Sequence, residues 1–446
     1  MFIAPIPAVT VEGIRLDRLV GVLCEIGGVE RLADLGTNGP LLASAGTESL
    51  FHCLFGRDAL RMALDLLDDF PAVARSTLVE LASLQGVVLN SRSEEEPGRI
   101  LHESRVPDDP HALRLAQTDW SFPYYGSVDA TPQWVNLLGA YCVRCGPDVL
   151  DVPLTDRASN SITLRDSLAS AVAWIIGRLD SLEAGGFLWV RRANPNGIAN
   201  QVWEDSYDAY YQADGTLFDA SRPFAPVAVQ GYAYDALLIG ADLLGNEWLR
   251  SRARQLRESV LAAFWQADLR TFALALTFER PGDAIAARVV GSDPGHLLAT
   301  RLLDGDDVSV LRRVLIERLL EADLLSCAGI RTKSTTAARF SPGGYHNGSS
   351  WPMDTGVIAD GLRRHGAARA ATDLEDRILS ACREIGAFPE FLRGDLDGVI
   401  RVNETVVETF ADGQPRRLEQ PPQMDQGWTA TRVWRILRQR NLVALA

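Results

Sequence analysis

The chain has 446 residues and a formal net charge of −14, and its contents of 47% hydrophobic and 23% charged residues are those of a soluble globular protein. The negative charge argues against nucleic acid or an anionic membrane as a partner. The sequence has no apolar run of about 18 residues, and its N-terminus lacks the basic and apolar regions of a leader peptide, so we expect a cytoplasmic protein without membrane spans.

Cysteine and histidine are too sparse and too irregularly spaced to indicate a disulfide framework or a metal site. No HxxxH or HExxH motif occurs among the six histidines. The single CxxC, Cys142 to Cys145, lies in an apolar helical stretch with no second pair at zinc-ribbon spacing, and we interpret it as a buried helix face. We therefore expect no metal and no organic cofactor.

The first 50 residues alternate short apolar and polar runs with Gly and Pro, and we expect an irregular arm there, packed on the rest of the chain. Beyond this arm, ten stretches have apolar residues at i, i+3, i+4 and i+7, which predicts helices. Half of these stretches end at glycine, as helices often do. They lie at 59–70, 71–86, 132–146, 164–182, 229–245, 247–265, 307–322, 351–366, 368–386 and 427–442.

Long loops rich in Gly, Pro, aromatic and acidic residues separate these helices. Helices with such loops after alternate members indicate a closed ring of helical hairpins, an all-α (α/α)₆ barrel. The absence of βα alternation, GxGxxG and Walker A motifs argues against a doubly wound fold, and the lack of a fixed period argues against a solenoid. We therefore predict an arm over 1–50 and a barrel over 51–446.

The loops offer polar groups for hydroxyls and aromatic faces for the apolar sides of sugar rings. Glycosidic cleavage needs two carboxyl groups, one protonated and one ionised. The stretch Asn200–Asp208 sets two aromatic residues among three acids, and a carboxylic acid held against aromatic rings keeps its proton near neutral pH. Asp205 is therefore our candidate catalytic acid. The alternative is that Trp203 and Tyr207, at i and i+4, are only the buried stripe of a helix.

Seven segments, in the same order, resemble those of bacterial glycogen-debranching amylo-α-1,6-glucosidases and, more distantly, of glucoamylases. They are LFGRDALR, EEEPGRILHESR, PYYGSVDATPQWVNLL, NQVWEDSYDA followed by VAVQGYAYDALL, SDPGHLLAT, GIRTKSTTAARFSPGGYHNGSSWPMDTGVIADGLRRHG and FPEFLRG. The resemblance covers about residues 51 to 394. It implies a six-hairpin (α/α)₆ glycoside hydrolase that acts at the end of an α-glucoside with inversion.

The resemblance also implies roles for individual residues. Asp205 matches the acid of the family's WKD motif, and Trp203 is expected to press on it and raise its pKa. Arg57 and Asp58 are expected to hold hydroxyls of the terminal sugar. The other substrate-binding candidates are Glu103, Tyr125, Asp129, Gln230, His346, Asn347, Trp351 and Asp354. A structural ion pair between Glu103 and Arg105, and a helix cap at Asp129, are the alternatives for those positions.

Two glutamates compete for the role of general base, which deprotonates water on the far face of the sugar. Glu390, in FPEF, matches the family's PE and is our first choice. Glu419 precedes QGWTA, and trehalase-like and mannosylglycerate-hydrolase-like barrels keep their base before a similar F-(G/S)-W-(T/S)-A stretch.

The chain departs from the debranching pattern at the expected mouth of the barrel. Ala228 replaces the Glu that the family often has before VQGY, and segments before Asn200 and after FPEF look like insertions. A filled mouth suits a short substrate better than a branched polymer. We therefore predict an exo-acting, inverting α-glycoside hydrolase that takes a small carbohydrate, an α-glucoside or oligosaccharide. The alternatives are a hydrolase of mannosylglycerate, glucosylglycerate or trehalose, and a barrel that binds sugar without cleaving it; the oligomeric state stays open.

Overall fold

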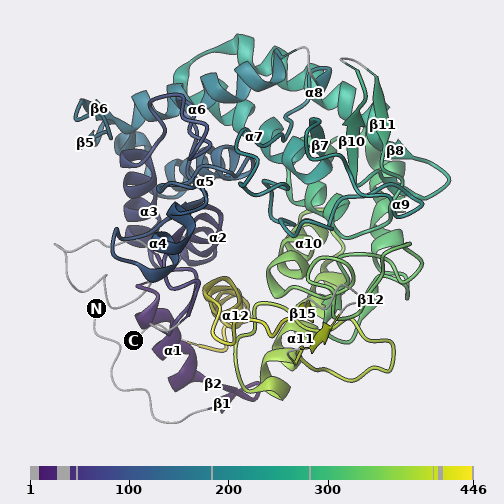
Figure 1. Ribbon diagram of the computed structural model, residues 1–446. Coiled ribbons are helices and arrows are strands. Elements are labelled where there is room, and N and C mark those ends of the chain that lie inside the picture. Colours follow the sequence, from purple (N-terminus) through teal and green to yellow (C-terminus); the bar gives the residue numbers. More distant parts are fainter. Residues whose placement is uncertain are drawn as a thin grey trace.

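The computed structural model describes residues 10–27, 41–46, 49–181, 184–280, 283–404, 406–409 and 415–443. Its helices are arranged as two rings, one inside the other (Figure 1). Each inner element contacts the next, and the last returns to the first. The inner ring consists of α2 (Gly56–Leu66), α5 (Ala130–Cys145), α7 (Val227–Leu244), the 3₁₀ helix η4 (Asp293–Ala299), α10 (Pro352–Arg364) and α12 (Gly427–Gln439).

The outer ring covers the inner one, and each outer helix packs against one or two inner neighbours. Its members are α3 (Pro71–Ser83), α6 (Leu164–Leu179), α8 (Glu247–Phe264), α9 (Ser309–Leu319), α11 (Ala368–Ile385) and α1 (Leu16–Glu25). The short helix α4 (Pro110–Ala116) lies in a loop outside both rings. This arrangement is the predicted (α/α)₆ barrel, and all ten predicted helices are confirmed.

Burial explains why the inner and outer helices differ in sequence. The outer helix α11 buries Leu374, Ile378 and Cys382, at i, i+4 and i+8, and turns charged residues outward. The inner helix α10 buries every residue from Pro352 to Ala359, because it has neighbours on all sides. The inner element η4 was not predicted, since seven residues containing Pro294 and Gly295 are too short to show a helical period.

Helix α1 lies within the expected N-terminal arm and packs against α12. The described part of the arm therefore completes the outer ring of the barrel, and a domain boundary at residue 50 stays a prediction. In the described part of the chain, no helix is long and apolar enough to cross a membrane.

The strands are short and lie in the loops. All their pairings are antiparallel, and β10 pairs with both β7 and β11 in a three-stranded sheet, while the others form two-stranded sheets. The strands are β1 (Thr10–Val11), β2 (Ile14–Arg15), β3 (Leu54–Phe55), β4 (Glu103–Ser104), β5 (Pro153–Thr155), β6 (Ser161–Thr163), β7 (Phe224–Pro226), β8 (Trp265–Gln266), β9 (Thr271–Phe272), β10 (Ala275–Phe278), β11 (Ala284–Ala286), β12 (Leu325–Ser326), β13 (Gly329–Ile330), β14 (Val406–Thr409) and β15 (Pro415–Glu419). Further 3₁₀ helices are η2 (Pro147–Asp151), η5 (Arg301–Leu303) and η6 (Asp306–Val308).

Candidate active site

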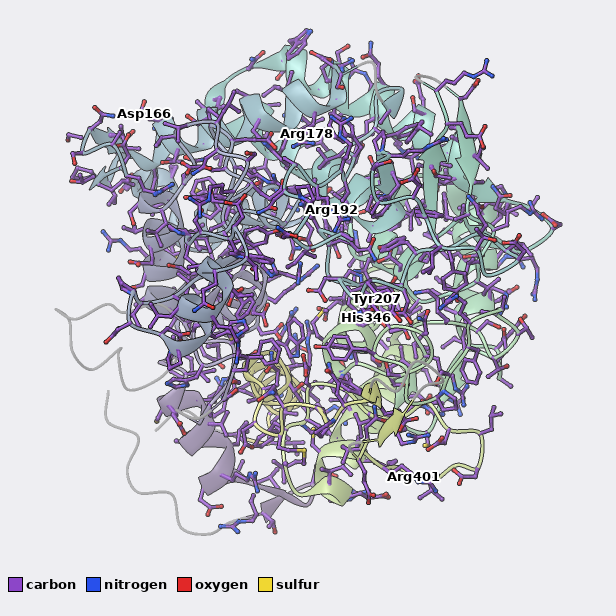
Figure 2. The ribbon with its side chains drawn as sticks, in the orientation of Figure 1. Asp166, Arg178, Arg192, Tyr207, His346 and Arg401 are labelled. Carbon is purple, nitrogen blue, oxygen red and sulfur yellow. The ribbon has the colours of Figure 1, made fainter. Side chains whose placement is uncertain are left out.

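A pocket opens at the end of the barrel where the inner helices begin. Arg57 and Asp58 lie in the first turn of α2, Trp351 directly precedes α10, and Gln426 directly precedes α12. Figure 2 shows Tyr207 and His346 near the centre of the ring at this end. The pocket is lined by Phe51, Phe55, Arg57, Asp58, His102, Trp203, Asp205, Tyr345, His346, Trp351, Glu390, Gln426 and Trp428.

The pocket is narrow in this structure. Its volume of about 40 Å³ leaves room for roughly three water molecules. A sugar ring is larger than that, so binding one requires side chains of the wall to move apart.

Asp205 reaches this pocket from the loop Asn200–Asp208, which is not helical. The alternative of a buried helix stripe is therefore wrong, and the two aromatic residues differ in exposure, since Trp203 is buried and Tyr207 is 75% exposed. Burial raises the pKa of Asp205 to about 6, although the guanidinium of Arg57 opposes this shift. Arg57 Nη1 lies 3.8 Å from Asp205 Oδ2.

A second ion pair holds Arg57 in place. Its Nε lies 2.8 Å from Asp129 Oδ2, and both side chains are buried. Asp129 also accepts a hydrogen bond from Ser127 Oγ at 2.6 Å. Although Asp129 precedes α5, its side chain makes no capping hydrogen bond, so the helix-cap alternative is wrong. Asp129 instead orients the arginine that faces Asp205.

Glu390 brings a second carboxyl group to the pocket. Tyr345 Oη donates a hydrogen bond to its Oε1 at 2.5 Å, and the backbone N–H of Gln423 donates to Oε2 at 3.2 Å. Burial raises the pKa of Glu390 to about 7, against the lowering effect of these two hydrogen bonds. The negative charges of Asp58 and Asp205 raise this pKa further, so the three carboxyl groups interact.

Asp58 is the third carboxyl group of the pocket. Gln426 Nε2 donates a hydrogen bond to its Oδ1 at 3.1 Å. Burial raises its pKa to about 7, with an opposing effect of Arg57 and a further increase from Asp205. Its place beside Asp205 is consistent with the predicted role of holding a sugar hydroxyl.

Aromatic rings form one wall of the pocket. Trp203 Nε1 donates to Asp293 Oδ1 at 2.6 Å, and its ring stacks on His296 with centroids 5.6 Å apart. Trp351 stacks on His346 at 4.9 Å, and Trp203 meets both rings edge-on. Burial lowers the pKa of His346 well below its ordinary value, with help from nearby cations, so this ring is neutral at pH 7.

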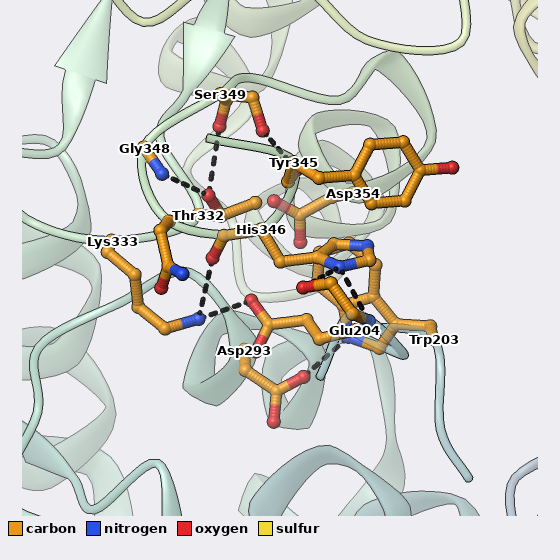
Figure 3. Close-up of polar contacts among 12 residues, drawn as sticks. Trp203, Glu204, Asp293, Thr332, Lys333, Tyr345, His346, Gly348, Ser349 and Asp354 are labelled. Atoms are coloured by element: carbon orange, nitrogen blue, oxygen red, sulfur yellow. Dashed lines mark hydrogen bonds and ion pairs between the residues drawn. The ribbon is translucent and has the colours of Figure 1, made fainter. Parts of the chain in front are cut away.

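The loop of Asp205 is tied to the barrel by a buried ion pair behind the pocket. Lys333 Nζ lies 2.6 Å from Glu204 Oε1 and donates a second hydrogen bond to the carbonyl oxygen of His346 at 3.1 Å (Figure 3). Neither charged side chain is exposed. Burial raises the pKa of Glu204, and Lys333 opposes this shift.

Several predicted substrate-binding residues do not line the pocket. Tyr125 is fully buried and its hydroxyl donates to the carbonyl oxygen of Leu84. The side-chain amide of Gln230 accepts a hydrogen bond from the N–H of Leu188 at 2.9 Å and donates one to the carbonyl oxygen of Leu188 at 2.7 Å. Gln230 therefore holds the loop that contains Leu188 against α7. Both residues therefore act within the protein core in this structure.

Three further candidates lie behind the pocket rather than in it. Glu103 forms an ion pair with Arg105, as the structural alternative expected. Asn347 donates to the carbonyl oxygen of Asp208 at 3.1 Å and so supports the loop of Asp205. Asp354 Oδ1 lies 2.7 Å from His296 Nε2, beneath Trp203.

Glu419 is also outside the pocket lining. Its Oε2 forms an ion pair with Arg393, and both side chains are about one fifth exposed. Of the two candidates for the base, the structure thus brings Glu390, and not Glu419, into the lining that contains Asp205.

Sequence reasoning missed several lining residues. Five of them stood in quoted motifs in which only neighbouring residues were chosen: Phe55, His102, Tyr345, Gln426 and Trp428. The other lining residue missed was Phe51, which lies outside the quoted motifs. Lys333, which lies behind the pocket and was also missed, had a signal of its own, because it is the only lysine in the chain.

The cysteine interpretation needs a correction. Cys142 is half-buried and Cys145 is exposed, so the CxxC does not form a buried helix face. In the described residues, no group of three or more His, Cys, Asp or Glu side chains is arranged to hold a metal ion.

Comparison with known structures finds the same fold in a glycoside hydrolase of family GH63. One similar structure is the GH63 mannosylglycerate hydrolase from Thermus thermophilus in complex with Tris and D-glycerate, with a TM-score of 0.61, 13% identity, and coverage of 92% of this chain and 98% of that one. The complex of that enzyme with glucose has a TM-score of 0.59 and 12% identity, with the same coverage. At such low identity these similarities concern the fold.

Sequence comparison identifies the family more directly. No curated protein matches the chain. The model of the mannosylglycerate hydrolase MGH1-like glycoside hydrolase domain matches residues 153–395, more than half of the chain and most of the barrel. The six-hairpin glycosidase relationship expected from the motifs is therefore correct, whereas the specific likeness to amylo-α-1,6-glucosidases is not supported. The chain belongs to the MGH1-like glycoside hydrolase family.

Proposed function

We propose that this protein hydrolyses the α-glycosidic bond of a small glycoside with inversion, using Asp205 as general acid and Glu390 as general base. The observation that supports this proposal is the pair of carboxyl groups in one aromatic-walled pocket, with pKa values raised to about 6 and about 7. Carboxyl groups with such values exchange protons near neutral pH, as acid–base catalysis requires.

The neighbours of each carboxyl group suit its proposed role. Asp205 is protonated when it donates to the leaving oxygen, and Arg57 then stabilises the carboxylate that forms. Glu390 accepts hydrogen bonds from Tyr345 and Gln423, which fix the orientation of its carboxylate toward a water molecule. Asp58 and the rings of Trp203 and Trp351 are available to hold the sugar between them.

Among substrates, the family favours a glycoside of glycerate. The matching family model is named for mannosylglycerate hydrolase, and a similar structure was solved with D-glycerate bound. Mannosylglycerate and glucosylglycerate are therefore the first substrates in this proposal, ahead of trehalose and α-glucosyl oligosaccharides.

The test is to incubate the protein with mannosylglycerate, glucosylglycerate, trehalose and isomaltose and to follow the released sugar by NMR. Hydrolysis of a glycerate glycoside with the β-anomer appearing first is the expected result. Initial release of the α-anomer would contradict inversion, and preferential cleavage of isomaltose would contradict the proposed substrate class.

A further inference from the structure

A second and larger cavity lies toward the other ends of the inner helices. Its volume is about 750 Å³, and its lining shares no residue with the candidate active site. Each of the six inner-ring elements contributes residues to its lining. On the five α-helices, the polar lining residues lie three or more residues after the first residue of the helix. At η4, they directly follow its last residue. Among the polar lining residues are Arg61 from α2, Asn136 from α5, Asp235 from α7, Arg301 from η5, Asp360 from α10 and Arg435 from α12.

Most charges that line this cavity are already compensated. Asp235 Oδ1 lies 3.1 Å from Arg301 Nε, and Asp360 Oδ2 lies 3.1 Å from Arg435 Nη1. Asp242 and Arg364, which also line the cavity, have ion-pair partners outside it.

Arg61 is the exception among the described charged residues of the lining. Its guanidinium makes no ion pair and no hydrogen bond with the described residues, and it lies over the ring of Tyr232, 5.0 Å from the centroid. Its charge helps to lower the pKa of Asp360, but that carboxylate is already paired with Arg432 and Arg435. An arginine presents five N–H donors and no acceptor, so this side chain is free to bind an anion. The cavity thus holds one arginine without an ion-pair partner in a chain of net charge −14.

Two amide oxygens that line the same cavity also lack partners. Gln133 Oε1 and Asn136 Oδ1 are buried without a hydrogen bond. The side chain of Gln133 is only 6% exposed. An unsatisfied buried acceptor is costly, and a ligand with hydroxyl groups removes that cost.

We propose that this cavity binds a small hydroxylated monocarboxylate of the size of a sugar acid. Its carboxylate pairs with Arg61, its hydroxyl groups donate to Gln133 and Asn136, and its carbon chain lies along aliphatic side chains such as Ile239. The single negative charge of a monocarboxylate matches the one unpaired arginine. A phosphate ester carries nearly two negative charges and would leave part of its charge without a partner. The cavity and its unpaired groups carry this inference, which does not depend on the proposed hydrolase activity.

Titration calorimetry with D-gluconate on the full-length protein tests the proposal, with sorbitol as the matched probe that lacks a carboxylate. We expect wild type and Asp205→Asn to bind gluconate equally, and sorbitol to bind at least about tenfold more weakly, because a charge-assisted hydrogen bond is lost. We expect Arg61→Gln to weaken gluconate binding by a similar factor.

A second variant keeps the test informative if Arg61→Gln does not fold. Gln133→Leu is expected to weaken gluconate binding by about two- to tenfold through the loss of one hydrogen bond. Far-UV circular dichroism checks the folding of both variants. The proposal is overturned if wild type shows no gluconate binding up to about 10 mM, or if binding is lost in Asp205→Asn but kept in the two cavity variants.

Discussion

Lys333 and Glu204 form an ion pair, 2.6 Å between Nζ and Oε1, in which neither side chain reaches solvent. The two residues are 129 positions apart, and Glu204 is the chain neighbour of Asp205. The only lysine of the protein therefore anchors the loop that holds the proposed acid, and it does so from the loop that also leads to His346.

Replacing Lys333 with methionine is expected to destabilise the protein strongly. The variant keeps the buried carboxyl group of Glu204 but removes its cation, and loss of one partner of a buried ion pair costs about 3–5 kcal/mol. Urea denaturation followed by tryptophan fluorescence measures the free energy of unfolding. The double variant Glu204→Gln, Lys333→Met removes both charges and is expected to recover part of the loss; equal stability of the single variant and wild type would contradict a buried charge pair.

Asp205→Asn is expected to lower kcat by about 10²–10⁴-fold, because the amide cannot donate a proton to the leaving oxygen. Sugar binding is expected to persist, since the shape of the side chain is kept. Asp208→Asn, three residues along the same loop and outside the pocket lining, is the matched control and should keep nearly full activity. Full activity of Asp205→Asn would rule out this residue as the acid.

The two candidate bases are separated by a pair of matched variants. Glu390→Gln is expected to lower kcat by about 10²–10⁴-fold, because the neutral amide cannot take the proton of the attacking water. Glu419→Gln breaks the partly exposed ion pair with Arg393 and is expected to leave kcat within a few-fold of wild type. The opposite pattern of activities would transfer the role of base to Glu419.

The pH dependence of kcat/KM is expected to show a broad maximum between about pH 6 and pH 7. The active form has Asp205 protonated and Glu390 ionised, and burial raises their pKa values to about 6 and about 7. Glu390 takes up its proton as the pH falls below about 7, and Asp205 loses its proton as the pH rises above about 6. The form with Asp205 protonated and Glu390 ionised is therefore a minority species, whose population is greatest between these two values and falls on either side. Initial rates measured from pH 4 to pH 9 test this profile, and a maximum near pH 4 would show that the pKa values are not raised.

Two tyrosines, one that lines the pocket and one that does not, test whether the effect of losing a tyrosine hydroxyl depends on its place relative to the pocket. Tyr345→Phe removes the hydrogen bond to Glu390 and is expected to lower kcat, because the base loses its orientation and is less ionised. Tyr125→Phe removes two hydrogen bonds outside the pocket lining, one donated to the carbonyl of Leu84 and one accepted from Arg157, and is expected to lower stability by about 1–3 kcal/mol with kcat unchanged. Kinetics and urea denaturation on both variants distinguish the two effects, and a large fall in kcat for Tyr125→Phe would restore it as a substrate-binding residue.

The sequence by itself determined the barrel and supplied candidates for the site. Helix periodicity is a local property, so it predicted ten helices correctly, from α2 to α12. The cluster of acids and aromatic residues around Asp205 is local as well, and together with the motif resemblance it nominated Asp205 as the candidate acid, a role that stays a prediction. The seven ordered motifs indicated the six-hairpin glycosidase relationship, which the matching family model supports.

Only the tertiary structure decided which distant loops meet. The sequence favoured Glu390 over Glu419 but left both open, whereas chain folding puts Glu390 beside Tyr345 in the pocket and Glu419 against Arg393 outside it. The same holds for Lys333 and Glu204, whose charges become partners only when two loops pack together. A buried charge is stabilised by whatever lies next to it in space, and that neighbour is fixed by packing between elements, not by spacing along the chain.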